Sequence, residues 1–60
     1  MNNQEIILEQ YFEDGILIYM VTRHLYTNEY YFKTPIKKGF KTISKSFQGD
    51  FTKEKNKWTK

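Results

Sequence analysis

Hydrophobic and polar residues are arranged along the first part of the chain in two segments typical of β-strands, Glu5–Phe12 and Ile16–Leu25. Both segments are rich in β-branched and aromatic residues, which suit a pleated, half-buried surface. Asp14 and Gly15 lie between them, and an Asp-Gly pair supplies the two positive-φ residues that a type I′ turn requires. The pattern therefore predicts an antiparallel hairpin with a two-residue loop.

A third strand is expected after a second turn at Thr27-Asn28, because asparagine tolerates left-handed backbone. This strand runs over Glu29–Thr34 and ends before Pro35, which has no N–H to donate to a neighbouring strand. Together the two turns predict a three-stranded antiparallel meander.

The two turns also assign side chains to the two faces of that sheet. Leu8 then faces Val21, Phe12 faces Leu17, and Tyr30 and Phe32 flank Arg23 and Leu25. One face is the predicted core: Ile6, Leu8, Phe12, Leu17, Tyr19, Val21, Leu25, Tyr30 and Phe32. The second face is mixed in character: Ile7, Glu9, Tyr11, Ile18, Met20, Thr22, His24, Tyr31 and Lys33.

The segment after Pro35 is compatible with two structures. Its apolar residues, from Ile36 to Phe51, recur at three- and four-residue spacing, which favours a helix. Glycines and β-branched residues within it oppose a long one. We expect a short helix from about Lys41 to Phe47 packed on the core face, with a fourth strand over Phe40–Lys45 as the alternative.

The expected fold is therefore α+β and β-rich. One small domain is expected over residues 1–51, and a mobile, Lys-rich tail over residues 52–60. Sixty residues lie near the lower limit for independent folding. The chain has no cysteine for a disulfide or a thiolate zinc site, so aromatic residues, 18% of the total, must supply the core.

The start of the chain lacks the positive charge of a secretory signal, and no apolar run is long enough for a membrane helix. We therefore expect a cytoplasmic protein that does not contact a membrane.

Charge divides the chain into an acidic first half and a basic second half. Residues 1–30 hold one arginine against five acids, a net charge of −4, whereas residues 31–60 hold nine lysines against two acids, a net charge of +7. Lysines neutralise phosphates, and the aromatic residues interleaved with them can stack on bases. We therefore expect a nucleic-acid-binding module. Its contacts are predicted at Arg23, Tyr31, Lys33, Lys37, Lys38, Lys41 and Lys45.

A second hypothesis is a small protein-binding inhibitor or adaptor, for example one encoded by a phage or another mobile element. An acidic hairpin can occupy a site built for nucleic acid, and methionine and aromatic residues are enriched in interface cores. The residues that would carry this function are Glu9, Tyr11, Glu13, Asp14, Ile18 and Met20. A homodimer through the second face is compatible with either hypothesis.

No pattern in the sequence points to catalysis. His24 is the sole histidine, and no cysteine or second histidine accompanies it. Ser44 and Ser46 have no base near them in the sequence, and Gly39 alone after two lysines does not make a phosphate-binding loop. We expect a protein that is not an enzyme and holds no metal or cofactor.

A short motif adds a resemblance to a DNA-binding family. The stretch Lys38-Gly39-Phe40-Lys41-Thr42 after a three-stranded meander resembles the amino-terminal arm-binding domain of tyrosine integrases. That resemblance implies a sheet lying in the DNA major groove and a helix that follows the motif and packs behind the sheet. The chain departs from that pattern in its single arginine, its lack of alanine, and a glycine at position 49 where the helix would continue.

Overall fold

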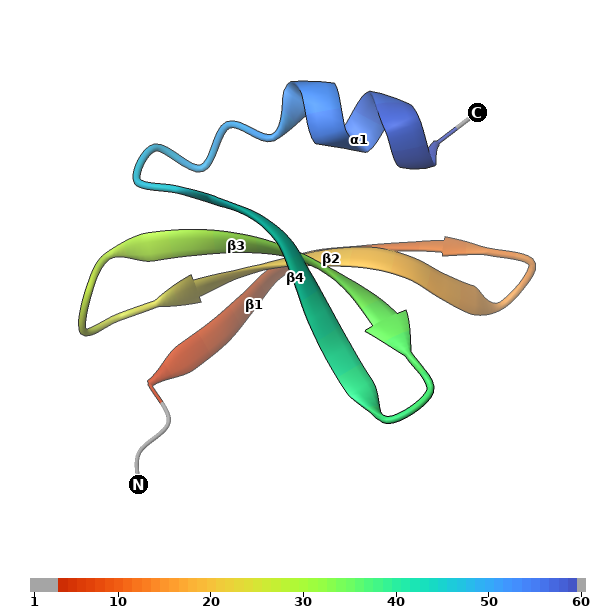
Figure 1. Ribbon diagram of the computed structural model, residues 1–60, viewed down its shortest axis with the longest axis horizontal. Coiled ribbons are helices and arrows are strands. Elements are labelled where there is room, and N and C mark those ends of the chain that lie inside the picture. Colours follow the sequence, from red (N-terminus) through yellow and green to blue (C-terminus); the bar gives the residue numbers. More distant parts are fainter. Residues whose placement is uncertain (1–3, 60) are drawn as a thin grey trace.

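A computed structural model describes residues 4–59 (Figure 1). Four strands form one antiparallel sheet in chain order: β1 (Glu5–Glu13), β2 (Ile16–His24), β3 (Glu29–Ile36) and β4 (Gly39–Ser46). A short helix, α1 (Thr52–Trp58), lies over one face of the twisted sheet. The predicted β-rich α+β meander is confirmed, with four strands in place of three.

The first turn forms as predicted, whereas the second is longer. Asp14 and Gly15 have φ values of 55° and 79°, as a type I′ turn requires. Residues 25–28 connect β2 to β3, and Asn28, at a φ of 59°, donates its N–H to the carbonyl of His24 at 2.9 Å. Arg23 therefore pairs with Tyr30 instead of Phe32. Because the register differs by two residues, each side chain of β3 keeps its predicted face.

Two register shifts correct the pairing predicted between β1 and β2. The ladder passes over Leu8, so that Glu9 faces Val21 in its place. A second shift further along restores the predicted pair of Phe12 with Leu17. Between the two shifts, Glu9 and Tyr11 lie on the core face, which the regular alternation of side chains had assigned to Leu8 and Phe12.

The core lies between the sheet and Phe51, the residue before α1. Phe32 is 0% exposed, with its ring centroid 4.7 Å from that of Tyr19 and 5.7 Å from that of Phe51. Tyr11 stacks on Tyr19 at 5.3 Å, on the side where Leu8 and Phe12 were expected. The predicted core residues Tyr19, Val21 and Phe32 are buried, but Ile6, Leu8, Phe12 and Leu25 are exposed.

β3 continues through Pro35 to Ile36, so the predicted end at Thr34 is wrong. In an antiparallel ladder, alternate residues direct their N–H away from a given partner strand. Ile36 pairs with Gly39 next to the turn, which leaves Pro35 directed toward the β2 side. The pairing of β3 with β2 has already ended at Lys33, so the missing N–H leaves no gap in either ladder.

The segment after the third strand forms β4, so the expected helix from about Lys41 to Phe47 is wrong and the alternative strand is correct. The β-branched Thr42 and Ile43 suit a strand. A register shift beside Ile43 lets it pack against the core cluster. The order implied by the integrase resemblance, with a helix after the motif at residues 38–42, is not found, because most of that motif belongs to β4.

α1 lies within the segment that the sequence analysis treated as a Lys-rich tail. None of its residues is buried. Phe51, the residue before the helix, packs on Phe32, and Lys55 Nζ donates to Glu9 Oε1 at 2.8 Å. The helix is therefore attached mainly by the residue before it and by one ion pair.

Candidate nucleic-acid interface

Four lysines lie along one side of the sheet, where β4 is an edge strand. Lys37 and Lys38 form the turn between β3 and β4, and Lys41 and Lys45 lie on β4 itself. All four are exposed, and among residues 4–59 no carboxylate forms an ion pair with any of them. We call these four residues the basic edge.

The basic edge presents charge on both faces of the sheet. Lys41 pairs with Thr34, which shares the α1 face with Phe32, whereas Lys45 pairs with Tyr31 on the opposite, open face. In a regular strand, residues four apart share a face. The register shift near Ile43 separates the two lysines and leaves positive charge on either side of the edge.

Exposed aromatic side chains accompany these lysines. Phe40, next to Lys41, is 46% exposed, and Phe47, directly after β4, is 73% exposed. Side chains of this kind can stack on unpaired bases.

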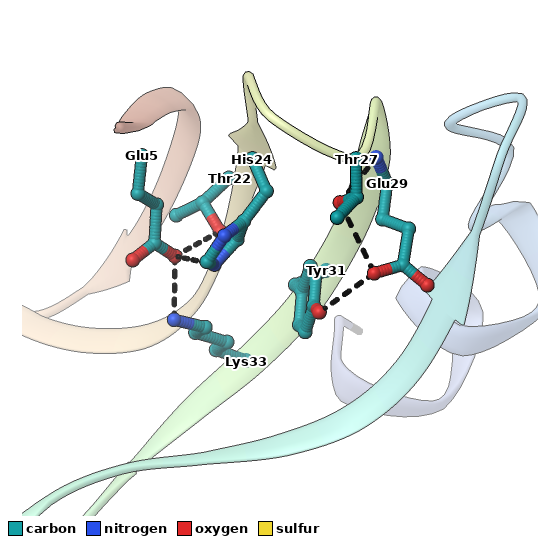
Figure 2. Close-up of polar contacts among 7 residues, drawn as sticks. All are labelled: Glu5, Thr22, His24, Thr27, Glu29, Tyr31 and Lys33. Carbon is teal, nitrogen blue, oxygen red and sulfur yellow. Dashed lines mark hydrogen bonds and ion pairs between the residues drawn. The ribbon is translucent and has the colours of Figure 1, made fainter. Parts of the chain in front are cut away.

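A separate polar cluster lies on the open face (Figure 2). Glu5 Oε2 accepts hydrogen bonds from Thr22 Oγ1 at 2.6 Å and from Lys33 Nζ at 2.5 Å, and it lies 3.8 Å from His24 Nε2. We call Glu5, Thr22, His24 and Lys33 the Glu5 cluster. The side chain of Lys33 is only 16% exposed, so its charge is neutralised within the protein and directed away from solvent.

The environment of Glu5 favours its ionised form. Burial alone would raise the pKa of Glu5, but the hydrogen bonds from Lys33 and Thr22 and the positive charge of Lys33 outweigh it. The pKa of Glu5 therefore lies below its ordinary value. A charged Glu5 ties the start of β1 to both β2 and β3.

Tyr31 lies next to the Glu5 cluster, and both its ring and its hydroxyl contact other residues of the protein. Its ring centroid lies 4.7 Å from that of His24, and Lys33 Nζ lies 5.6 Å from the ring centre. Its hydroxyl donates to Glu29 Oε1 at 3.0 Å, as Figure 2 shows, and this hydrogen bond raises the pKa of Tyr31. Tyr31 thus has a structural role between β2 and the basic edge.

Arg23 lies on the other face of the sheet, since it pairs with Tyr30 while its neighbour Thr22 pairs with Tyr31. Its Nη2 donates to Asn28 Oδ1 at 2.6 Å, and its guanidinium carbon lies 5.7 Å from the ring centre of Tyr30. The structure therefore divides the predicted nucleic-acid contacts into three places. These are Arg23 at the loop after β2, Tyr31 with Lys33 on the open face, and the basic edge.

The residues predicted for protein binding are also divided. Tyr11 and Ile18 pack against the core cluster, whereas Met20 is buried on the open face, where it pairs with Lys33. They therefore do not form one exposed aromatic patch. Glu13 and Asp14, which we call the acidic turn, lie at the end of the β1–β2 hairpin, with Asp14 exposed.

Glu9 also differs from the expectation, because it faces α1. Its carboxylate accepts hydrogen bonds from Lys55 and from the Tyr19 hydroxyl, the latter at 3.1 Å. The hydrogen bond from Lys55 lowers the pKa of Glu9, and that from Tyr19 adds to the effect.

The role of Glu5 was not predicted from the sequence, although two signals for it are present there. The predicted hairpin already places Glu5 opposite His24, and Thr22, His24 and Lys33 were assigned to one face. An acid beside a lysine on a half-covered face is a candidate ion pair.

Residues 4–59 contain no group of three or more potential metal ligands, and no helix among them is long and apolar enough to span a membrane. Comparisons with protein families, curated proteins and solved structures found no match.

Proposed function

We propose that this protein binds nucleic acid through the basic edge, and that it prefers single strands. The observation that carries the proposal is the contrast between paired and unpaired lysines. Lys33 and Lys55 are neutralised by Glu5 and Glu9, whereas the four lysines of the basic edge are exposed and unpaired within residues 4–59. Unpaired lysines can neutralise phosphates and release their counterions.

The preference for single strands rests on Phe40 and Phe47. Both are exposed beside lysines of the basic edge. Stacking an unpaired base on an aromatic ring contributes about 1–3 kcal/mol and depends little on sequence. In a duplex the bases are already stacked on one another, so only the phosphate contacts would remain. Because neither stacking nor phosphate contacts distinguish the bases strongly, the proposed complex has little sequence preference.

The proposed site is smaller than the set predicted from sequence. Lys33 is neutralised by Glu5, and Arg23 lies away from β4 at the loop after β2, where its guanidinium is hydrogen-bonded to Asn28. The acidic turn lies at the end of the β1–β2 hairpin, on the side of the sheet away from the edge strand β4. Its charge repels phosphate and favours binding on the β4 side.

The test compares two double substitutions that remove the same charge. Lys41→Gln with Lys45→Gln removes two lysines of the basic edge, and Lys53→Gln with Lys57→Gln removes two exposed lysines of α1. At low salt, the β4 pair should weaken binding of a labelled single-stranded oligonucleotide at least tenfold. The α1 pair should weaken it less than threefold. Equal weakening by both would show that only net charge matters, and would contradict a site on β4.

A second candidate function is supported by the hairpin tip. Phe12 and Ile16 are exposed on either side of the acidic turn. An acidic tip with apolar flanks is a surface for a basic protein partner, consistent with an inhibitor or adaptor. Absence of nucleic-acid binding at low salt would favour this candidate. Glu13→Lys should then weaken the protein complex, while Lys45→Glu should leave it unchanged.

A further inference from the structure

The sheet has two unpaired edges of opposite charge. β1 and β4 are the outer strands, and each presents backbone N–H and C=O groups on its outer side. β1 holds three glutamates, of which Glu5 and Glu9 are paired with lysines and Glu13 forms no ion pair within residues 4–59; β4 holds two unpaired lysines and no acid. We infer that β1 of one copy pairs with β4 of a second copy, in antiparallel orientation, to continue the sheet across the two molecules.

The geometry of the meander brings the unpaired charges together in such a pair. In a four-stranded meander, the β1–β2 turn and the β3–β4 turn lie at the same end of the sheet, and Figure 1 shows both on the right. Antiparallel addition of a second β4 beside β1 therefore places Lys37 and Lys38 of the second copy beside Glu13 and Asp14. These lysines have no other ion-pair partner within residues 4–59.

Pairing between two β4 edges is opposed by charge. It would bring the unpaired Lys41 and Lys45 of one copy near those of the other, and like charges facing each other across strands are destabilising. Pairing of β4 with β1 avoids this repulsion and adds attraction to the acidic turn, so the charges favour it.

An exposed apolar side chain lies near the turn end of each edge. Phe12 on β1 and Phe40 on β4 are both exposed, and the same antiparallel addition brings them to one end of the seam, next to the lysines and the acidic turn. Cross-strand contacts between such side chains stabilise a sheet. A second copy of this chain therefore fits each edge in charge and in this apolar contact.

Such pairing joins two different edges, so it does not stop at a dimer by symmetry. Successive copies add in a row until the sheet closes into a ring or continues as an open chain. The contact also involves Lys37 and Lys38, which the proposed nucleic-acid site shares. Self-association does not require nucleic-acid binding, so it is tested on protein that is free of nucleic acid.

The test uses two variants of the full chain with reversed charge at one edge each. Glu13→Lys with Asp14→Asn alters the acidic turn, and asparagine keeps the residue type that tolerates the φ of 55° found there. Lys37→Glu with Lys38→Glu alters the basic edge. Sedimentation velocity is measured on nucleic-acid-free protein at rising concentration up to the high micromolar range. Circular dichroism confirms that each variant is folded.

The wild type should associate with rising concentration, and each variant alone should associate at least tenfold more weakly. An equimolar mixture of the two variants should recover association, because each reversed edge then meets an edge of opposite charge. A wild type that stays monomeric at low salt overturns the inference. So do variants that associate like the wild type, or a mixture that does not recover.

Discussion

Replacing Glu5 by glutamine should destabilise the protein, because Glu5 Oε2 is the shared acceptor for Thr22 and Lys33. A hydrogen bond to a charged group contributes about 1.5–3 kcal/mol. The glutamine oxygen can still accept from Thr22, so the loss is mainly that of the charge. The Glu5 side chain is 26% exposed, and solvent weakens the pair. We therefore expect about 1–2 kcal/mol less free energy of unfolding at pH 7.

The pH dependence follows from the lowered pKa of Glu5. A carboxyl group with a lowered pKa in the folded state contributes stability above its unfolded pKa, and loses it as the pH falls through the folded value. The ordinary value is 4.5. The free energy of unfolding of the wild type should therefore exceed that of Glu5→Gln at neutral pH. The difference between the two should shrink as the pH falls below 4.5.

The assay is urea unfolding at pH 7 and at acid pH, with Glu29→Gln as the control. Glu29 also accepts from a hydroxyl, that of Tyr31 at 3.0 Å, but it pairs with no lysine within residues 4–59. Glu29→Gln should therefore lower the free energy of unfolding much less than Glu5→Gln. Lys33→Met should lower the free energy of unfolding about as much as Glu5→Gln does. The double variant should lose less free energy of unfolding than the sum of the two single losses. Equal stability of Glu5→Gln and wild type at pH 7, or additive losses, would refute the ion pair.

Two further predictions concern the core and the segment leading to α1. Phe51→Ala should cost about 3–5 kcal/mol in urea unfolding, because Phe51 is buried against Phe32. A loss below about 1 kcal/mol would show that the sheet does not depend on this contact. Gly49→Ala should cost more than Gly15→Ala, although both glycines have positive φ. The added Cβ at position 49 would lie 3.1 Å from the Tyr30 ring, whereas nothing lies within 4 Å at position 15. Equal losses at the two positions would contradict this packing.

Local backbone chemistry made the hairpins predictable. The positive φ values at Asp14, Gly15 and Asn28 follow from residue types that tolerate left-handed backbone. The meander also explains why the charges separate in space. In a sheet whose strands follow chain order, the first and last strands become the two edges. An acidic beginning and a basic end of the sequence therefore become an acidic edge and a basic edge.

The wrong predictions concern segments whose local sequence allows two structures and whose tertiary packing selects one of them. The register shift at Leu8 exchanges leucine for Glu9 and Tyr11 on the core side, where they contact Lys55 and Tyr19. Those contacts depend on where α1 lies, and the spacing within β1 does not reveal it. Likewise, the apolar spacing around Ile43 is compatible with a helix, whereas the pairing of its neighbours Thr42 and Ser44 with β3 makes the segment a strand.

The positive charge of the candidate site could be predicted from the sequence, but the sequence could not show which lysines belong to it. Sequence reasoning found Lys37, Lys38, Lys41 and Lys45, and it treated Lys33 as equivalent to them. The ion pair that neutralises Lys33 is formed with Glu5, 28 positions away, and depends on the register of three strands. Only the folded arrangement distinguishes a neutralised lysine from an exposed one.

The most direct test is the salt dependence of binding between this protein and a labelled single-stranded oligonucleotide, with a duplex of the same sequence measured in parallel. Four lysine contacts to a single strand predict that affinity falls about 50-fold between about 50 and 200 mM salt. Binding to the duplex should be weaker at each salt concentration, because Phe40 and Phe47 have no unpaired base to stack on. Absence of binding at the lowest salt concentration, or an affinity that does not change with salt, would contradict nucleic-acid binding by the basic edge.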